Sequence, residues 1–375
     1  MAADDHIRVR FSPDIFRAQV HGGVSRYITA IHRGLVARGI DSRILAGLHC
    51  NSYLGDAPRT VGLDVERLRP IRARQALTKV ADRGLERIWC ARPHDRTIWH
   101  KTMFDRHIPT APRLAVTVHD MIHERFPEQF GPRDVTPASK RPWCEAADVV
   151  FTNSENTRDD LLDRFRLRAE KVVVTPLGVT VAEPREGPLP FRERPWILYV
   201  GERSKPYKNW SGALDALAAL GPEVGLACFG PAPTDDDHAA VAARGLSERV
   251  RFIGGDDEDL ARVYRGASAL VYPSHFEGFG LPPLEAMAHG CPVVAARAGA
   301  IPEVVGDAAI LVDPADGAAL AGALDRVVAG GDEIRTLTSA GRAHAATYTW
   351  DRTVEAALVG YRMITSERPR TGRSR

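Results

Sequence analysis

Cysteines are few in this sequence, and no two of them form a CxxC pair. The five that occur are Cys50, Cys90, Cys144, Cys228 and Cys291. Their odd number and scattered positions argue against a disulfide framework or a structural zinc site and fit a reducing compartment. Long apolar runs and a secretory signal are missing too, since no stretch of about 18 apolar residues occurs and MAADDHIRVRF lacks a cationic segment followed by an apolar one. We therefore expect a cytoplasmic protein.

Net charge is also small, at +2, but it is unevenly distributed along the 375 residues. Residues 1–178 contain 29 Lys and Arg against 22 Asp and Glu, a surplus of +7, whereas residues 179–375 contain 21 against 26, a deficit of −5. In residues 67–92 arginines are interleaved with apolar residues at roughly helical spacing. That pattern is typical of a helix lying on an anionic membrane surface, and equally of a solvated helix whose arginine stems cover the core.

The sequence therefore leaves open a peripheral contact with the inner face of the plasma membrane through residues 67–92. Nucleic acid is not expected as a partner, because the basic first half has no recognisable binding motif or base-stacking platform.

Short β-rich runs alternate with helical patterns along the chain, which indicates an α/β fold with parallel sheets covered by helices. In the first half we expect strands at residues 7–11, 42–46, 98–101, 114–119, 149–153 and 172–176. The polar, proline-rich stretch at 179–195 is typical of an interdomain linker. The pattern then restarts, with strands expected at 196–200, 225–229, 250–253, 269–272, 292–295 and 309–312.

Two successive doubly wound units follow from this pattern, and a cleft between them is the default place for a ligand. We expect one Rossmann-like domain over 1–178 and a second over 196–349, joined by the linker. An amphipathic C-terminal helix follows at 350–364 and can cross back to the first domain. The tail at 365–375 is basic and lacks apolar residues, so we expect it to be disordered.

The most informative stretch is EGFGLPPLEAM, residues 277–287, which follows a predicted strand and begins a helix. Gly278 and Gly280 let the backbone approach a ligand, and the free amides at the positive end of the helix suit a diphosphate. Glu285, which we place in the first helical turn, can accept two hydrogen bonds from a ribose diol. Glu277, on the loop, can reach the hydroxyls of a nearby sugar. The spacing predicts two carboxylates on either side of the phosphates.

A second stretch, GERSKPYKN at 201–209, ends the first strand of the second domain. Ligands bind beyond the carboxyl ends of parallel strands, so Arg203 and Lys208 are placed to neutralise a diphosphate. A solvated basic loop would have the same composition. The stretch contains neither GxGxxG nor GxxxxGK[ST], which argues against a dinucleotide or P-loop site.

Together these stretches resemble the retaining glycosyltransferases of family 4, whose GT-B architecture has two Rossmann-like domains facing a central cleft. Glu277 and Glu285 match the family's E-x7-E pattern. GERSKPYKN, IPEVVGDAAILVDPAD at 301–316 and the glycine loop GGVSRY at 22–27 match it as well. The resemblance runs over nearly the whole chain and is densest at 196–316.

The resemblance implies that Glu285 holds the ribose and that Glu277 contacts the donor sugar as a catalytic residue. It implies a diphosphate site built from Arg203, Lys208, Gly22, Gly23 and the backbone of Phe279, Gly280 and Leu281. Residues 1–178 would then be the acceptor side and residues 196–349 the nucleotide-sugar side. We expect the two carboxylates and the two cations to converge on one ligand.

In the first half, His119-Asp120 follows the apolar run 114–118, so His119 lies at a strand end facing the expected cleft. A single histidine at such a place is often structural, but the resemblance implies that it contacts the donor sugar as a catalytic residue. Asp120 can orient the imidazole or cap the next segment, and the sequence does not decide between the two. Ser154 is a weaker candidate, since it can equally cap the helix that begins there.

Acidic runs at 235–237 and 256–259 stand directly before helical patterns, where capping and the helix dipole favour carboxylates. We interpret them as helix starts and expect neither a metal nor a cofactor. Arg203 and Lys208 would then stabilise the leaving diphosphate. The resemblance implies retention at the anomeric carbon, for which we favour front-face transfer.

The expected substrates are a nucleotide-diphosphate sugar and a glycan or lipid-linked acceptor. The similarity of GGVSRY and FEGFGLPPLEAM to the family favours GDP-mannose and polysaccharide or O-antigen assembly. Two alternatives stand beside this interpretation: a UDP-sugar-dependent transferase of the same family, and a non-catalytic protein that binds a sugar nucleotide.

Overall fold

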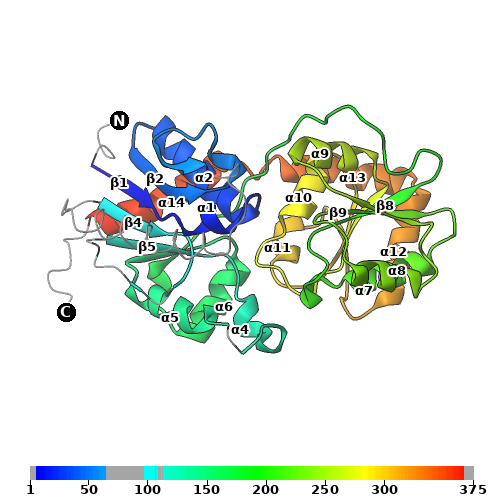
Figure 1. Ribbon diagram of the computed structural model, residues 1–375, viewed down its shortest axis with the longest axis horizontal. Coiled ribbons are helices and arrows are strands. Elements are labelled where there is room, and N and C mark those ends of the chain that lie inside the picture. Colours follow the sequence, from blue (N-terminus) through cyan, green and yellow to red (C-terminus); the bar gives the residue numbers. More distant parts are fainter. Residues whose placement is uncertain are drawn as a thin grey trace. The chain divides into compact units, whose positions relative to one another are not determined.

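The computed structural model describes residues 6–64 and 97–366, apart from residues 106, 109, 110, 112 and 133. The chain divides into two compact units, shown in Figure 1. Unit 1 comprises Met1–Gly178 and Trp350–Arg375, and unit 2 comprises Val179–Thr349. The basic stretch at 67–92 and the tail beyond Ser366 lie outside the described residues. In the described part of the chain, no helix is both long and apolar enough to span a bilayer.

Unit 1 is built on a parallel sheet in the order β3-β2-β1-β4-β5-β6-β7 among its described residues. The strands are β1 (Arg8–Phe11), β2 (Asp41–His49), β3 (Thr60–Asp64), β4 (Thr97–Lys101), β5 (Arg113–Val118), β6 (Val149–Thr152) and β7 (Val172–Val174). The helices are α1 (Asp14–Ala18), α2 (Gly23–Ala37), α4 (Ile122–Arg125), α5 (Thr136–Ala146), α6 (Glu155–Phe165) and α14 (Trp350–Ser366), with short 3-10 turns at Ser52–Leu54, Pro127–Gln129 and Ala169–Lys171.

Helices cover both faces of this sheet, which is why every residue of the central strand β5 is buried. On one face the apolar side chains of β4, β5 and β6 pack against α5 and α6. On the other face lie α2 and α14, which also pack against each other. In Figure 1 the red α14 lies among the blue and cyan elements of unit 1, although it comes last in the sequence.

Unit 2 is built on a second parallel sheet, in the order β10-β9-β8-β11-β12-β13. The strands are β8 (Trp196–Val200), β9 (Gly225–Phe229), β10 (Val250–Ile253), β11 (Ala269–Tyr272), β12 (Val293–Ala296) and β13 (Ile310–Val312). The helices are α7 (Trp210–Ala219), α8 (Asp235–Ala242), α9 (Asp257–Gly266), α10 (Leu281–Ala288), α11 (Ile301–Val305), α12 (Gly317–Ala329) and α13 (Asp332–Ala345), with a 3-10 turn at Pro206–Lys208.

The α/β class with two parallel sheets is therefore confirmed. Four strands of unit 2 begin and end at the predicted residues, because each is a compact apolar run between turn residues. Strand β3 was not predicted, and its sequence TVGLD is largely exposed at the edge of the sheet. An exposed edge strand lacks the apolar pattern that marks a buried one.

Residues 179–195, expected to be a linker, belong to unit 2 and lie along the start of α9. The Arg185 guanidinium forms ion pairs with Asp256 at 2.8 Å and Asp259 at 2.9 Å, and the Arg185 N–H donates to the Glu258 carbonyl. Further along, Arg262 donates to the Pro188 carbonyl at 2.6 Å. The segment is therefore attached to the surface of unit 2 at several points.

Candidate functional site

In unit 2 the loops that follow the adjacent strands β8 and β11 are hydrogen-bonded to each other. The His275 N–H donates to the Tyr207 carbonyl at 2.8 Å, and Asn209 Nδ2 donates to the Pro273 carbonyl at 3.1 Å. These bonds bring the Lys208 Nζ to 2.7 Å from Glu277 Oε1. Lys208 thus neutralises a mostly buried carboxylate, which allows both groups to face an anionic ligand.

The Asn209 backbone explains part of this geometry. Asn209 adopts a left-handed conformation, with φ of 52°, and its side chain caps α7 by accepting from the Gly212 N–H at 3.1 Å. Asparagine tolerates that conformation better than most residues. The sequence alone gave this residue no role, although an Asn directly before a helical pattern is a recognisable cap signal.

Arg203 is more enclosed than the sequence suggested, since only 2% of its side chain is exposed. Its Nε lies 3.1 Å from Asp237 Oδ2, and its Nη2 donates to the Pro231 carbonyl at 2.7 Å. Its Nη1 is buried and has no hydrogen-bond partner in the described part of the chain. Burial by itself would raise the pKa of Asp237, but the Thr234 N–H and the Arg203 guanidinium together lower it. The N–H groups of Arg203 Nη1 are thus the ones left for a ligand.

Glu285 lies on α10, one turn further into the helix than expected, because α10 begins at Leu281. The expectation of a first-turn position was wrong: the glycine at 280, with φ of 112°, starts the helix earlier. Glu285 is buried, and Tyr264 of α9 donates a hydrogen bond to its Oε2 at 3.2 Å. Tyr264 therefore orients the carboxylate, a role that was not predicted from the sequence.

Gly280 is the N-cap of α10 and Leu281 its first residue, so the backbone of Phe279, Gly280 and Leu281 leads into the helix. The carbonyl of Glu277 accepts a hydrogen bond from the Ala300 N–H at 3.0 Å, so the loop after β12 supports the Glu277 loop. Gly299 makes this contact possible, since a Cβ there would lie 2.5 Å from the Glu277 carbonyl oxygen. Gly299 also has φ of 56°. This supporting residue was missed by sequence reasoning.

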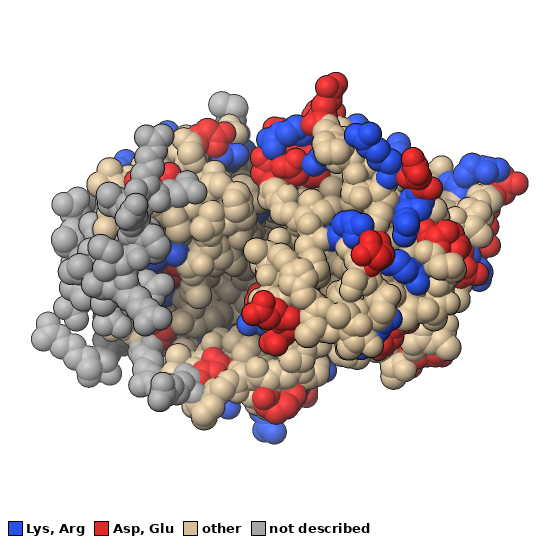
Figure 2. Space-filling model, turned by 45° about the vertical axis from the view of Figure 1, so that its right-hand side comes forward, with Lys and Arg blue, Asp and Glu red and all other residues tan. Residues whose placement is uncertain are grey.

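The two acidic runs of unit 2 are built into helix starts. Thr234 and Asp237 form a capping box on α8, and Asp256 and Asp259 form another on α9. On the face of unit 2 seen in Figure 2, positive and negative side chains are interspersed, and neither sign forms a broad continuous area. These carboxylates serve the helix termini, as the sequence indicated.

In unit 1, His119 directly follows β5 and its ring packs edge-on against Tyr27 of α2, with ring centroids 5.2 Å apart. Its Nε2 is buried and has no hydrogen-bond partner among the residues described. Desolvation lowers the pKa of His119 to about 4, with Asp120 opposing and Lys140 adding to that shift. The imidazole is therefore neutral near pH 7.

Beneath His119 a chain of buried polar groups crosses the unit. Tyr27 pairs with Thr175 through their hydroxyls at 2.7 Å. His100 pairs through Nε2 with the Thr117 hydroxyl at 2.8 Å and through Nδ1 with the Tyr361 hydroxyl of α14 at 2.7 Å. Burial lowers the pKa of His100 to about 3. Helix α14 thus completes the support behind the strand end that carries His119.

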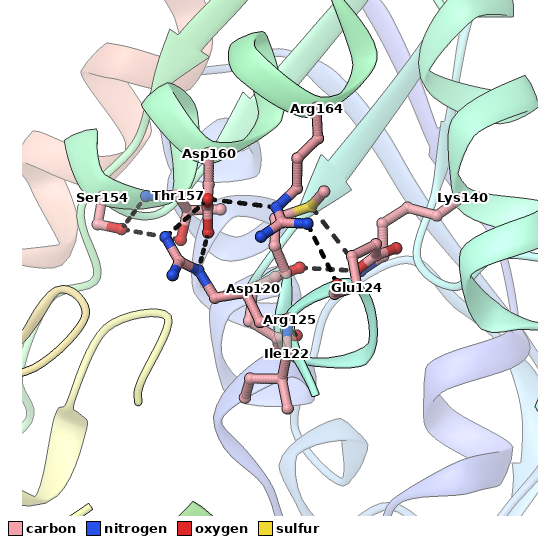
Figure 3. A network of polar contacts seen from close by, with 10 residues as sticks. Asp120, Ile122, Glu124, Arg125, Lys140, Ser154, Thr157, Asp160 and Arg164 are labelled. Carbon is pink, nitrogen blue, oxygen red and sulfur yellow. Dashed lines mark hydrogen bonds and ion pairs between the residues drawn. The ribbon is translucent and has the colours of Figure 1, made fainter. Parts of the chain in front are cut away.

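Asp120 Oδ1 accepts a hydrogen bond from the N–H of Ile122, the first residue of α4, at 3.1 Å. Figure 3 shows how Lys140 of α5 fixes this segment: its Nζ donates to the Asp120 carbonyl at 3.0 Å and to Glu124 Oε2 at 2.7 Å. In the same view Arg125 and Arg164 reach Asp160 of α6. The turn after His119 and helix α4 are thereby attached to α5 and α6.

Gly22 and Gly23 lie at the start of α2, where Gly22 is the N-cap residue. A Cβ on Gly22 would lie 2.4 Å from Gln19 Oε1, so the glycine lets that side chain fold over the helix start. Ser154 is the N-cap of α6, and its hydroxyl accepts from the Thr157 N–H at 3.0 Å. The capping interpretation of Ser154 is the one that the contacts favour.

Within each unit, then, the predicted residues gather at the carboxyl ends of the parallel strands. In unit 2 Lys208 and Glu277 are in direct contact, whereas Arg203 pairs with Asp237 and Glu285 with Tyr264. In unit 1 His119 and Asp120 follow β5, and the two glycines begin α2.

Two family models match this chain: one described as Glycosyltransferase Family 4 matches residues 21–183, and one described as Glycosyl transferases group 1 matches residues 194–329. The O-antigen chain mannosyltransferase B of Escherichia coli is 29% identical over 372 residues, covering 91% of this chain and 96% of that protein. The MMP alpha-(1->4)-mannosyltransferase of Mycolicibacterium hassiacum is 36% identical over 222 residues, covering 56% of this chain and 53% of that protein. The solved structure of Anabaena Alr3699/HepE in complex with UDP and glucose matches 96% of this chain and all of that one, with a TM-score of 0.72 and 19% identity.

Proposed function

Because the chain belongs to glycosyltransferase family 4 and has the GT-B fold, we propose that it moves a hexose from a nucleotide-diphosphate sugar to a growing glycan or a lipid-linked acceptor. The proposed donor is GDP-mannose, and the proposed setting is polysaccharide or O-antigen assembly. Two mannosyltransferases among the relatives, one of them matched over nearly its full length, support this choice.

The observation that carries the proposal is the contact between Lys208 and Glu277 in unit 2. The Glu277 carboxylate is buried, whereas 19% of the Lys208 side chain is exposed. This pair suits a ligand that carries both hydroxyl groups and phosphates. In the proposed complex Lys208 and Nη1 of Arg203 bind the diphosphate, together with the backbone of residues 279–281. Glu277 then accepts hydrogen bonds from the sugar, and Glu285 accepts them from the ribose.

Unit 1 contributes His119 to the sugar and the Gly22–Gly23 helix start to the phosphates in this proposal. A neutral imidazole is suited to hydrogen-bond a sugar hydroxyl without adding charge beside the reacting carbon. The bond from the anomeric carbon to the leaving phosphate oxygen breaks, and the acceptor oxygen forms the new bond on the same face. The leaving phosphate oxygen takes the acceptor proton, and the cations of unit 2 stabilise the diphosphate.

The experiment is a panel of GDP-, UDP-, ADP- and dTDP-sugars, scored first by thermal shift and then by release of nucleoside diphosphate with a lipid-linked glycan acceptor. We expect GDP-mannose to raise the apparent melting temperature most and to be turned over, since a ligand that binds the native state stabilises it by mass action. A larger shift and turnover with a UDP-sugar would overturn the donor assignment and favour the alternative within the family. Binding without turnover of any donor would favour the non-catalytic alternative, and a product of inverted anomeric configuration would exclude front-face retention.

A further inference from the structure

Asn153 lies beside His119 at the same edge of the unit 1 sheet. Strands β5 and β6 are parallel and paired, with Val118 opposite Thr152, so His119 and Asn153 each come one residue after that last pair. Side chains alternate between the faces of a sheet, which places both residues on the face of Thr117 and Phe151. That face is the one covered by α2 and α14, since His119 packs on Tyr27 and Phe151 on Tyr361.

The amide of Asn153 is buried with its oxygen unsatisfied. The residue is only 4% exposed, and its Oδ1 has no hydrogen-bond partner in the part of the chain that the structure describes. His119 Nε2, at the neighbouring strand end, is unsatisfied as well. Buried polar groups in folded proteins are almost always hydrogen-bonded, to protein, water or ligand. Two such atoms at neighbouring strand ends, on one face of the sheet, therefore form a place where a ligand can supply the missing bonds.

The chemistry of the two atoms defines the group that fits them. An amide oxygen only accepts a hydrogen bond, and a neutral imidazole can donate from its Nε2–H. A phosphate or carboxylate has no proton to give to the amide oxygen, so an anion leaves Asn153 unsatisfied. A hydroxyl group donates one hydrogen bond and accepts another, and it therefore satisfies both side chains at once.

We infer that Asn153 and His119 together bind one hydroxyl group of the transferred hexose, the hydroxyl donating to Asn153 Oδ1 and accepting from His119 Nε2. This inference rests on the proposed function and adds to it a sugar-contacting residue in unit 1. Asn153 thereby becomes a determinant of which hexose is transferred, because it reads the presence and orientation of a single hydroxyl.

A matched control exists in the same unit. Asn51 is equally buried, at 2% exposure, but its polar atoms are satisfied: Oδ1 accepts from the Tyr53 N–H at 3.1 Å and Nδ2 donates to the Gln19 carbonyl at 2.7 Å. Replacing an asparagine whose polar atoms are hydrogen-bonded leaves its partners without a hydrogen bond. Replacing one whose oxygen has no partner leaves no such group behind. The two positions should therefore respond in opposite ways to substitution by alanine.

The test compares Asn153→Ala and Asn51→Ala for melting temperature, affinity for free nucleoside diphosphate, donor hydrolysis without acceptor, and transfer. Asn153→Ala is expected to keep or raise the melting temperature, to bind nucleoside diphosphate within two-fold of the wild type, and to lose about ten-fold or more in kcat/KM for hydrolysis and transfer, in line with the loss of one hydrogen bond. Asn51→Ala is expected to lower the melting temperature and to keep kcat/KM within two-fold. Asn153→Ser provides a second, smaller truncation should the alanine variant fold poorly.

A set of deoxy donors, each lacking one hexose hydroxyl, completes the test. With one of these deoxy donors, the wild type should lose as much kcat/KM as Asn153→Ala loses with the complete donor. With that same deoxy donor, Asn153→Ala should lose little more, because removing the hydroxyl and removing the amide delete the same contact. Equal kinetics for Asn153→Ala and the wild type, as expected if only water fills the site, would overturn the inference. So would a variant that hydrolyses the donor normally and fails only in transfer, because the hydroxyl would then belong to the acceptor. A wild type that turns over no nucleotide sugar is a different result, and it refutes the proposed function itself.

Discussion

The predicted site residues at the carboxyl ends of the parallel strands differ in kind between the two units. In unit 2 the predicted residues are charged and largely paired, Lys208 with Glu277 and Arg203 with Asp237. In unit 1 the corresponding position after β5 carries a neutral imidazole, His119, next to the neutral amide of Asn153. Charged groups stand nearby in unit 1 as well: the Asp120 carboxylate directly follows His119, and Lys140 is paired with Glu124.

Under the proposed function, this difference separates two tasks of a reaction that removes a sugar from a diphosphate. The charged groups would compensate the phosphates, and their pairing would keep the cations in place while no ligand is bound. Neutral groups can contact a sugar near the reacting carbon without adding a fixed charge there. If the comparison is right, substitutions in unit 2 should mainly change donor binding, and substitutions in unit 1 should mainly change turnover.

The largest difference between the two units should be in how their stability responds to lower pH. Burial lowers the pKa of His119 to about 4 and that of His100 to about 3, so the unfolded chain binds protons near pH 6.5 that the folded unit 1 does not. Their stabilising contribution is present above pH 6.5 and is lost as the pH falls toward the folded values. Each ring contributes at most about 1.4 kcal/mol per pH unit, and this limit is reached only well below pH 6.5, where the unfolded imidazole is fully protonated. The two rings together therefore contribute about 3 kcal/mol between pH 6.5 and 5.

Amide hydrogen exchange at pH 6.5, 5.7 and 5 measures this effect when rates are corrected for intrinsic exchange. Protection should fall in β4 to β6 of unit 1 before it falls in β8 to β11 of unit 2. Loss of protection in unit 2 before unit 1 would contradict the expected difference between the units. As a control, His119→Gln should show a smaller pH dependence than the wild type, since one of the buried imidazoles of unit 1 is removed.

The next largest effect is expected for His119→Ala. The variant removes a group that is proposed to act on the sugar in the transition state, so kcat should fall about 100-fold while the donor KM stays within about three-fold. Steady-state kinetics with the donor varied measures both constants. His123→Ala is the matched control, because His123 pairs with Asp134 at 2.7 Å on the following segment and should leave both constants unchanged. A selective rise in KM for His119→Ala would assign the histidine to donor binding.

Lys208→Ala should have a smaller effect, and it should change the donor KM instead of kcat. Losing the charge removes a contact to the diphosphate and leaves Glu277 without its partner, so the donor KM should rise about ten-fold. Added salt should weaken donor binding less in the variant than in the wild type. Isothermal titration with nucleoside diphosphate at two salt concentrations measures this, with Lys205→Ala on the same loop as the control. An unchanged affinity would remove Lys208 from the proposed phosphate site.

The smallest effect is expected for Tyr264→Phe, which deletes only the hydroxyl that donates to Glu285 at 3.2 Å. The loss of one orienting hydrogen bond should raise the donor KM about five-fold and leave kcat unchanged. Kinetics of Tyr264→Phe, Glu285→Ala and the double variant form a cycle. If Tyr264 acts through Glu285, the double variant should be no worse than Glu285→Ala, and strict additivity would contradict that role.

Much of the architecture could be predicted from local sequence. The strands of unit 2 are compact apolar runs between turn residues, and the acidic runs before α8 and α9 have the spacing of capping boxes. The exposed edge strand β3 could not be predicted, since its residues carry no burial pattern. Glu285 was placed one turn too early because the helix start depends on the backbone of Gly280.

The sequence by itself determined the two parallel sheets and the residues that stand at their strand ends, because periodicity, caps and strand termini are properties of neighbouring residues. Only the tertiary structure decided which of those residues have partners. It paired Lys208 with Glu277 across 69 positions, enclosed Arg203 against Asp237, and left Asn153 and His119 unsatisfied side by side. Whether a polar atom is paired depends on residues that lie far apart along the chain and become neighbours only through the register of the strands.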